Sequence, residues 1–417
     1  MGKPTIRFKG YTDDWEQRKL DDLTEELSEY ATMASGLPLL TSSRSGLMYQ
    51  SDFRDRKTTT SDETLFSIVP KGSCTYRHMS DDDIFHMNIN VLEKGLVSRE
   101  YPVFISSENN DLEFIIQHIN SSDRFRAFCK GQKKGGTRTR LYYKTLCEFE
   151  MMIPSIEEQK KISATLHSLD HLITLHQRKC DQAKILKKYM LQKMFPQNDE
   201  KVPKIRFKGF TDDWEQRKLG EVLVSLQNNT LSRADLSNEI GVAKNVHYGD
   251  VLIKFGEVLD VSIEQLPMIS DESILGKYKA SFLQNGDVIV ADTAEDLTVG
   301  KCSEIAGLKD EVVLSGLHTI PYRPTKKFSS GYLGYYLNSG AYHDQLIPLM
   351  QGIKVTSISK SAMQDTSIIY PKLEEEQRKI GTYFRSLDEL ITLHQHKCEE
   401  LKNIKKFMLQ NMFVQEK

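Results

Sequence analysis

The residues best suited to binding chemistry form a cationic run between positions 124 and 144. The run reads RFRAFCKGQKKGGTRTRLYYK and contains no acid. Its eight cations are Arg124, Arg126, Lys130, Lys133, Lys134, Arg138, Arg140 and Lys144. Since the formal net charge of the whole chain is only −2, cations gathered in this way make a local anion-binding surface, and the phosphates of nucleic acid are the anions that fit it. The alternative is a solvated basic face without a ligand.

A weaker set of cations lies in the second half of the chain. Residues 136–139 read GTRT and residues 352–356 read GIKVT, so a glycine, a cation and hydroxyls recur at corresponding places. The candidate cations in this half are Lys354, Lys360, Arg323, Lys326 and Lys327. Arginine can hydrogen-bond the edge of guanine with two donors, which lysine does less well. The last three of these cations suit ordinary loop charges equally well.

The sequence lacks the motifs of common catalytic sites. It has no GxxxxGK[ST] loop, no GxGxxG between a strand and a helix, and no HExxH. A DNA adenine methylase should carry Asp/Asn-Pro-Pro-Tyr/Phe, and the chain contains no Pro-Pro pair. The acidic group at 81–83 is expected in a loop or at a helix start rather than around a metal. These absences predict a chain without catalytic residues and without a cofactor of its own.

Histidine and cysteine occur four residues apart twice, as His176 with Cys180 and as His394 with Cys398. Two histidines and two cysteines would suit zinc if the pairs met; the alternative, that they are partly polar residues of a helix contact, is favoured, so no metal is expected. None of the six cysteines belongs to a CxxC pair, which indicates a reducing, cytoplasmic environment. No stretch approaches the 18 apolar residues of a membrane span.

Two blocks of sequence must position these residues, and each block occurs twice. Residues 4–20 and 203–219 are identical at 15 of 17 positions and share RFKG and TDDWEQRKL. Residues 157–195 and 375–413 are identical at 24 of 39 positions without a gap. The chain is therefore built on a frame that occurs twice, with dissimilar sequence between its parts.

The longer block is expected to be a helix in both copies. Each copy follows a proline, opens with glutamates and ends among lysines, which is the order favoured by helix starts and by the helix dipole. Apolar residues recur at heptad spacing and predict a coiled-coil seam. The expected seam residues are Ile162, Leu166, Leu169 and Ile173 in the first copy and Ile380, Phe384, Leu387 and Ile391 in the second. Four further residues are expected to widen the buried stripe: Leu172, Leu175, Leu186 and Tyr189.

Neither helix can keep such an apolar stripe in water alone, so each needs a partner. Because the inserts stand at alternate ends of the helices, we expect the two copies to pair antiparallel, with a pseudo-twofold axis. The alternative is that each helix docks on its own insert.

The two inserts, residues 21–150 and 220–370, are each long enough for a domain. They mix helical stretches with short β-like runs such as 101–105 and 287–291. The predicted fold class is α+β, with two α/β recognition domains that alternate with two long helices. The expected domains, in the order recognition domain, helix, recognition domain, helix, are residues 1–150, 151–200, 201–370 and 371–417.

The repeated blocks also carry a family likeness. The IRFKG-[FY]-TDDWEQRKL blocks and the paired EEQ-[KR]-KI…SLD…ITLHQ…MLQ-x-MF helices resemble the specificity subunit of type I restriction-modification systems. Segments 286–301, 314–324 and 332–380 of the second insert resemble it as well, and the first insert does so more weakly, mainly through 136–162. The resemblance covers essentially the whole chain.

The resemblance implies a division of labour. Each insert would be a target recognition domain that binds one half of a split site on double-stranded DNA, and the helices would set the distance between the halves. Modification subunits, two of them, would dock on the helices, carry S-adenosylmethionine and methylate an adenine at N6 in each half-site. Restriction subunits would use ATP and magnesium to translocate and cut unmethylated DNA. The chain itself would hold no cofactor and catalyse nothing.

Three other functions fit parts of the sequence. A DNA-binding regulator would also need basic domains on a frame, and it would bind its operator tightly alone. A nuclease or methylase with an unfamiliar site would be active as the purified chain. A coiled-coil scaffold without a DNA role would leave the cations of residues 124–144 unexplained.

Overall fold

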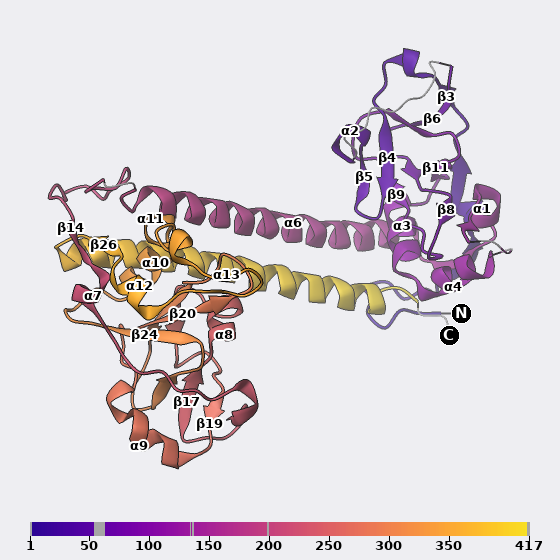
Figure 1. The fold of residues 1–417 in the computed structure, drawn as a ribbon. Helices are drawn as coiled ribbons and strands as arrows, with labels where there is room; N and C mark the ends of the chain where they lie inside the picture. Colours follow the sequence, from indigo (N-terminus) through magenta and orange to yellow (C-terminus); the bar gives the residue numbers. More distant parts are fainter. Residues whose placement is uncertain (1, 54–62, 134, 136, 198–199, 415–417) are drawn as a thin grey trace. The chain divides into compact units, whose positions relative to one another are not determined.

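The chain divides into two compact units. Unit 1 comprises Met1–His176 and His396–Lys417, and unit 2 comprises Gln177–Gln395 (Figure 1). Each unit thus holds one insert, one copy of the shorter block and part of both long helices. The residues that this computed structural model describes are 2–53, 63–133, 135, 137–197 and 200–414.

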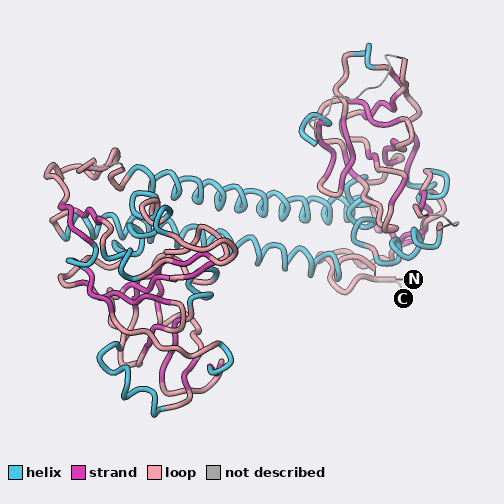
Figure 2. The backbone as a smooth tube through the Cα atoms, in the orientation of Figure 1, coloured by secondary structure: helices cyan, strands magenta, loops and turns pink. Residues whose placement is uncertain are grey.

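Both copies of the longer block are helical, as predicted. Helix α6 spans Ile156–Lys193 and helix α13 spans Glu374–Asn411, each without a break (Figure 2). Glutamates occupy the first turn of each helix, where negative charge is favoured by the helix dipole. Gly381 is explained by packing: a Cβ there would lie 2.8 Å from the backbone oxygen of Ser330.

The two helices pair antiparallel within each unit. In unit 1, Cys398 Sγ lies 3.5 Å from the carbonyl oxygen of Ile173, and Lys405 Nζ lies 2.6 Å from Asp170. Residue numbers therefore increase along α13 in the direction in which they decrease along α6, which makes the two helices antiparallel.

Unit 2 shows the same arrangement. Cys180 Sγ lies 3.9 Å from the carbonyl oxygen of Ile391, and Lys187 Nζ lies 2.6 Å from Asp388. Lys187 also lies 2.8 Å from Glu257 of the insert, so a lysine on the seam ties the second insert to the helix pair.

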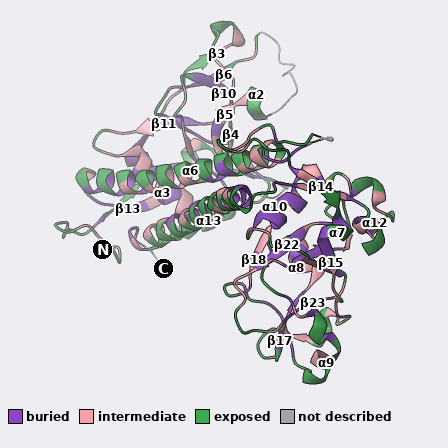
Figure 3. Cartoon of the chain, turned by 90° about the vertical axis from the view of Figure 1, so that its left-hand side faces the viewer, coloured by how far each residue is buried: buried purple, intermediate pink, exposed green. Residues whose placement is uncertain are grey.

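The predicted seam residues are buried or half-buried. The buried seam residues are Ile162, Leu166, Ile380, Phe384 and Leu387, and the half-buried ones are Leu169, Ile173 and Ile391. The prediction of a wider stripe is wrong, because Leu172, Leu175, Leu186 and Tyr189 are 38 to 49% exposed. In a two-helix contact only the a and d positions reach the partner helix. Figure 3 shows the outer faces of both helices as exposed.

The shorter block ties each insert to both helices of its unit. In unit 1, β1 (Glu16–Lys19) pairs antiparallel with β13 (Glu150–Ile153), and Ile6 N–H donates to Asn411 at the end of α13. In unit 2, β14 (Glu215–Lys218) pairs with β26 (Ser367–Tyr370) in the same way. Short helices α1 and α7 follow β1 and β14 at Leu20–Leu23 and Leu219–Val222.

A buried ion pair stands at the same place in each block. Arg7 donates to both carboxylate oxygens of Glu158 at 2.7 Å, and Arg206 donates to those of Glu376 at 2.7 and 2.9 Å. The glutamate side chains are 0 and 2% exposed, so the arginine supplies the charge that their burial requires.

The two inserts share an inner sheet. In the first insert its strands are, in spatial order, β2 (Thr24–Glu26), β11 (Val103–Ser106), β7 (Cys74–Thr75) and β9 (Asn88–Ile89). In the second they are β15 (Leu223–Ser225), β24 (Thr319–Pro324), β20 (Val288–Ala291), β22 (Cys302–Ala306) and β18 (Val258–Asp260). In both inserts, the first four strands of this spatial order are the first, fourth, second and third of them along the chain. All neighbours among these four strands are antiparallel. The β-like runs at 101–105 and 287–291 correspond to β11 and β20.

The outer sheets of the inserts differ. The first insert has β10 (Gly95–Ser98), β6 (Phe66–Val69) and β3 (Tyr30–Ala31), together with a hairpin of β4 (Leu40–Ser43) and β5 (Gly46–Tyr49). The second has β16 (Leu236–Ser237), β19 (Met268–Ile269), β17 (Ala243–Val246) and β23 (Val313–Ser315), in which β17 and β23 are parallel. The inserts therefore have a common base and dissimilar outer parts.

Helices complete each insert. Those of the first are α2 (Gln50–Phe53), α3 (Leu112–Ser121), α4 (Asp123–Gly131) and α5 (Tyr143–Leu146). Those of the second are α8 (Tyr248–Ile253), α9 (Leu275–Tyr278), α10 (Tyr332–Asn338), α11 (Gly340–His343) and α12 (Lys360–Gln364). The predicted fold class, two α/β domains that alternate with two long helices, is confirmed.

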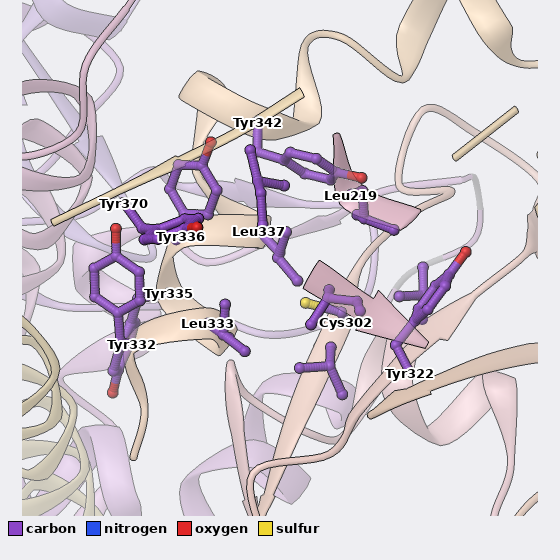
Figure 4. Packing of buried hydrophobic residues seen from close by; sticks show 14 of the residues in the cluster. Leu219, Cys302, Tyr322, Tyr332, Leu333, Tyr335, Tyr336, Leu337, Tyr342 and Tyr370 are labelled. Atoms are coloured by element: carbon purple, nitrogen blue, oxygen red, sulfur yellow. The ribbon is translucent and has the colours of Figure 1, made fainter. Parts of the chain in front are cut away.

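Each core runs from an insert into the helix pair of the same unit. In unit 2 a group of tyrosines, among them Tyr332, Tyr336 and Tyr342, packs with leucines of α10 (Figure 4). Phe195, at the end of the first long block, stacks on Phe384 with ring centroids 5.8 Å apart. In unit 1 the equivalent phenylalanine of the second long block, Phe413, stacks on His118 at 4.8 Å.

Candidate nucleic-acid interface

The structure divides the cationic run of the first insert among three elements. Helix α4 holds Arg124, Arg126 and Lys130 on its exposed face, since Phe125 and Cys129 point into the core. Arg140 lies on the two-residue strand β12 (Thr139–Arg140), and α5 carries Lys144. All described cations of this run are exposed, and Lys134 falls outside the described residues.

Acids from elsewhere in the chain face part of this run, which the local sequence did not indicate. Arg138 Nε donates to Asp81 at 2.7 Å, and Lys133 Nζ lies 3.8 Å from Asp83. Arg126 pairs with Asp123 within α4. These three cations are therefore paired with carboxylates, whereas Lys130, Arg140 and Lys144 form no ion pair among the described residues.

The acids belong to a loop, as expected, and the loop borders a cleft. Strand β8 (Met79–Ser80) pairs with β12 and leads into residues 81–83. The cleft has a volume of about 640 Å³, and Arg44, Arg77, His78, Asp81, Asp82 and Tyr101 are among the residues that line it. We call it the first-insert cleft. No sequence pattern singled out Arg44, which follows β4 at a turn.

Two titratable side chains that line the first-insert cleft, Asp82 and His78, have shifted pKa values. Hydrogen bonds from Arg44 and Ser80 hold the pKa of Asp82 below its usual value. Burial lowers the pKa of His78, although Glu100 opposes the shift. His78 stacks against Tyr142, with ring centroids 5.7 Å apart.

Among the cations predicted in the second insert, three have structural partners. Arg323 is bound to buried Asp287 at 2.7 and 3.0 Å and also donates to the carbonyl oxygen of Phe282. The ammonium of Lys326 lies 3.9 Å from the ring centroid of Tyr370, and Lys327 pairs with Glu374 at the start of α13. These contacts favour a role in holding the insert together.

The remaining two lie where the first insert has its own candidates. Strand β25 (Thr356–Ser357) pairs with β21 (Thr293–Ala294), as β12 pairs with β8. Lys354 precedes β25, and Lys360 begins α12, and both are exposed. The shared glycine, cation and hydroxyl motif thus leads into an equivalent pair of strands in both inserts.

No metal site occurs in the part of the chain that the structure describes, in the sense that no three His, Cys, Asp or Glu side chains gather around a common point. Cys180 and Cys398 are buried in the helix seam and point to backbone carbonyl oxygens. This arrangement matches the second interpretation of the histidine and cysteine pairs, as residues of a helix contact.

The chain belongs to the family described as type I restriction modification DNA specificity domain, which matches residues 68–184 and 211–403. A relative from Methanocaldococcus jannaschii, the type I restriction enzyme MjaVIII specificity subunit, is 26% identical over 287 residues. That alignment covers 67% of this chain and 65% of the length of the relative. The predicted resemblance to specificity subunits is thereby confirmed at the level of the family.

Solved structures agree with this fold. The S subunit of a type I restriction-modification system from M. genitalium matches over 100% of both chains, with a TM-score of 0.59 and 12% identity. A chain from a structure that describes complex assembly and conformational transition of the type I R-M system matches over 98% of this chain and 99% of that one, with a TM-score of 0.50 and 16% identity. In the described part of the chain, no helix is both long and apolar enough to cross a membrane.

Proposed function

We propose that this chain is the specificity subunit that directs a type I restriction-modification complex to a split DNA site. Each insert binds one half-site, and the chain performs no chemistry. S-adenosylmethionine, ATP and magnesium act on partner subunits in the cytoplasm, where an adenine in each half-site is methylated at N6 or unmethylated DNA is cut.

The observation that carries this proposal is the combination of a common inner sheet with dissimilar outer parts. Both inserts join the repeated frame in the same way, through the pairing of β1 with β13 and of β14 with β26. The outer sheets and the exposed side chains differ. Two different surfaces carried by the same repeated frame suit the recognition of two different short DNA sequences.

The long helices offer a surface for the modification subunits. Besides Leu172, Leu175, Leu186 and Tyr189, the equivalent residues of the second copy are exposed: Leu390, Leu393, Ile404 and Phe407. Exposed apolar side chains that occur at matching positions of both copies are suited to protein contacts rather than to water. Because large apolar residues occur at matching positions of both copies, we propose that two copies of one partner dock there.

The division of labour is tested by exchanging one insert. Residues 21–150 are replaced by the corresponding insert of another family member, and the methylated sites are read by sequencing DNA from cells that contain the complete system. We expect one half-site to change and the other to stay. The matched exchange of residues 220–370 should change the other half-site, and a change of both halves, or of neither, would contradict the proposal.

The spacing role of the helices has its own test. Lengthening α6 and α13 by about one turn adds about 5 Å to each. We expect the number of base pairs between the half-sites to change, while the half-sites themselves stay the same. An unchanged spacer would refute this role.

The alternative functions predict different results from the purified chain. A regulator would bind one DNA site tightly without partners, and a nuclease or methylase would act on DNA alone. We expect neither, and we expect sequence-specific methylation only when the modification subunits are present.

A further inference from the structure

The hairpin of β4 and β5 presents an arginine at its tip. The two-residue turn between the strands is Arg44–Ser45, and the side chain of Arg44 is 62% exposed. A two-stranded β-ribbon is one of the elements that the major groove of DNA admits. The tip borders the first-insert cleft, so the arginine stands at the edge of a polar concave surface.

Two neighbouring aspartates that line this cleft each hold one arginine. Asp82 accepts a hydrogen bond from Nη2 of Arg44, and Asp81 accepts one from Nε of Arg138 at 2.7 Å. Asp82 is itself fixed by the hydroxyl of Ser80 at 2.8 Å. The two arginines are therefore held by consecutive residues of one loop.

The geometry leaves donors available on both arginines. Arg138 is held through Nε, and its two terminal nitrogens donate no hydrogen bond among the residues described. Asp82 takes one N–H of Nη2 of Arg44, which leaves the second N–H of Nη2 and the N–H donor beside it on the same edge of the guanidinium group. Guanine presents O6 and N7 side by side in the major groove and accepts two such donors from one arginine.

The pairs are better explained by orientation than by stability. Their side chains are 44 to 62% exposed, and ion pairs this exposed add little to folding. A carboxylate that fixes a guanidinium in advance reduces the conformational freedom that base contact would otherwise remove. It also offsets the positive charge, so that attraction to phosphates of any sequence is weaker.

An independent feature marks the cleft as a polar binding site. His78 lines it, its side chain is 3% exposed, and its Nδ1 is buried without a hydrogen-bond partner among the described residues. Buried polar atoms in native proteins are nearly always hydrogen-bonded, so an unpaired one calls for a partner.

We propose that Arg44 and Arg138 each read one guanine in the half-site bound by the first insert, with Asp82 and Asp81 as positioning residues. This inference rests on the proposed function and names the bases and the side chains that the first insert uses. The first half-site therefore contains at least two G·C pairs.

The test uses lysine substitutions, which keep the charge but lose the two-donor fork. Arg44→Lys and Arg138→Lys are each expressed with the modification subunits, and methylated sites are mapped in genomic DNA. Each variant should lose preference at one G·C position of the first half-site by about tenfold to a hundredfold. The second half-site should be unchanged. Arg99→Lys serves as control, because Arg99 lies over the ring of Tyr30 and does not line the cleft.

A second variant and a modified base keep the test decisive if a lysine variant yields little complex. Asp82→Asn leaves Arg44 in place but removes the charge that orients it, and it should relax the same position as Arg44→Lys. Duplexes with 7-deazaguanine at that position lack the N7 acceptor. The wild-type complex should bind them about tenfold more weakly, while the complex with Arg44→Lys should not distinguish them from guanine.

The possible outcomes separate this inference from the proposed function. If both lysine variants and Asp82→Asn keep full preference at every position, or if the relaxed positions are not G·C pairs, the guanine contacts are refuted while the specificity role stands. If wild-type cells carry no methylated split site at all, the proposed function itself fails.

Discussion

The buried ion pairs of the two repeats allow one prediction to be worked through in detail. Replacement of Arg7 by alanine leaves the carboxylate of Glu158, which is 0% exposed, without a charged partner. Removal of one member of a buried ion pair costs about 3 to 5 kcal/mol. For a unit of this size, that cost corresponds to a melting temperature lower by about 6 to 20 °C.

The second repeat supplies a matched comparison. Arg206→Ala uncovers Glu376, but the indole N–H of Trp214 still donates to this carboxylate at 3.3 Å. In the first repeat, Trp15 Nε1 has no partner among the described residues. Because a hydrogen bond to a charged group contributes about 1.5 to 3 kcal/mol and this one is long, we expect Arg206→Ala to cost about 1 kcal/mol less than Arg7→Ala.

The assay follows from the two tryptophans of the chain, of which one lies in each unit. Fluorescence during urea denaturation reports unit 1 in a Trp214→Phe background and unit 2 in a Trp15→Phe background. Arg18→Ala, which removes an exposed ion pair with Glu16 in the same block, is the control and should leave the midpoint unchanged.

The reasoning would be refuted if Arg7→Ala shifted the midpoint of unit 1 no more than Arg18→Ala does. A further check is the double variant Arg7→Ala/Glu158→Gln. It should recover part of the lost stability, because no charge is then left buried.

Three further predictions use the same fluorescence assay. Lys187→Met leaves two mostly buried carboxylates facing each other and should destabilise unit 2 by about 2 to 3 kcal/mol, whereas Lys405→Met leaves one half-exposed carboxylate in unit 1 and should cost under about 1 kcal/mol; equal effects would contradict this. Burial lowers the pKa of His118 to about 4, so the folded state binds fewer protons than the unfolded state between pH 4 and 6.5. Unit 1 should therefore lose stability as the pH falls through that range, and His118→Phe should flatten this pH dependence. Burial raises the pKa of Glu304 to about 7, so the folded state binds more protons than the unfolded state between pH 4.5 and 7. Unit 2 should therefore lose stability as the pH rises through that range, and Glu304→Gln should remove this pH dependence. For either residue, parallel pH profiles of the wild type and the variant would refute the assignment.

The sequence by itself determined the frame of this protein. The repeats, the two long helices and their heptad seam were all readable, because helix periodicity and internal repetition are local properties of the chain. The family likeness followed from the same blocks. The exposure of Leu172 and Tyr189 could not be predicted from the sequence. An apolar residue beside a helix seam is buried or exposed according to how many elements pack against it.

Only the tertiary structure decided which cations are available to a ligand. Arg323 and Lys326 look like surface charges in the sequence, but the sheet brings Asp287 to the first and the ring of Tyr370 to the second. Arg44 looks unremarkable until β4 and β5 carry it to Asp82. These partners are between 36 and 44 residues away in the chain, and electrostatic contact depends on distance in space, which sequence spacing does not fix.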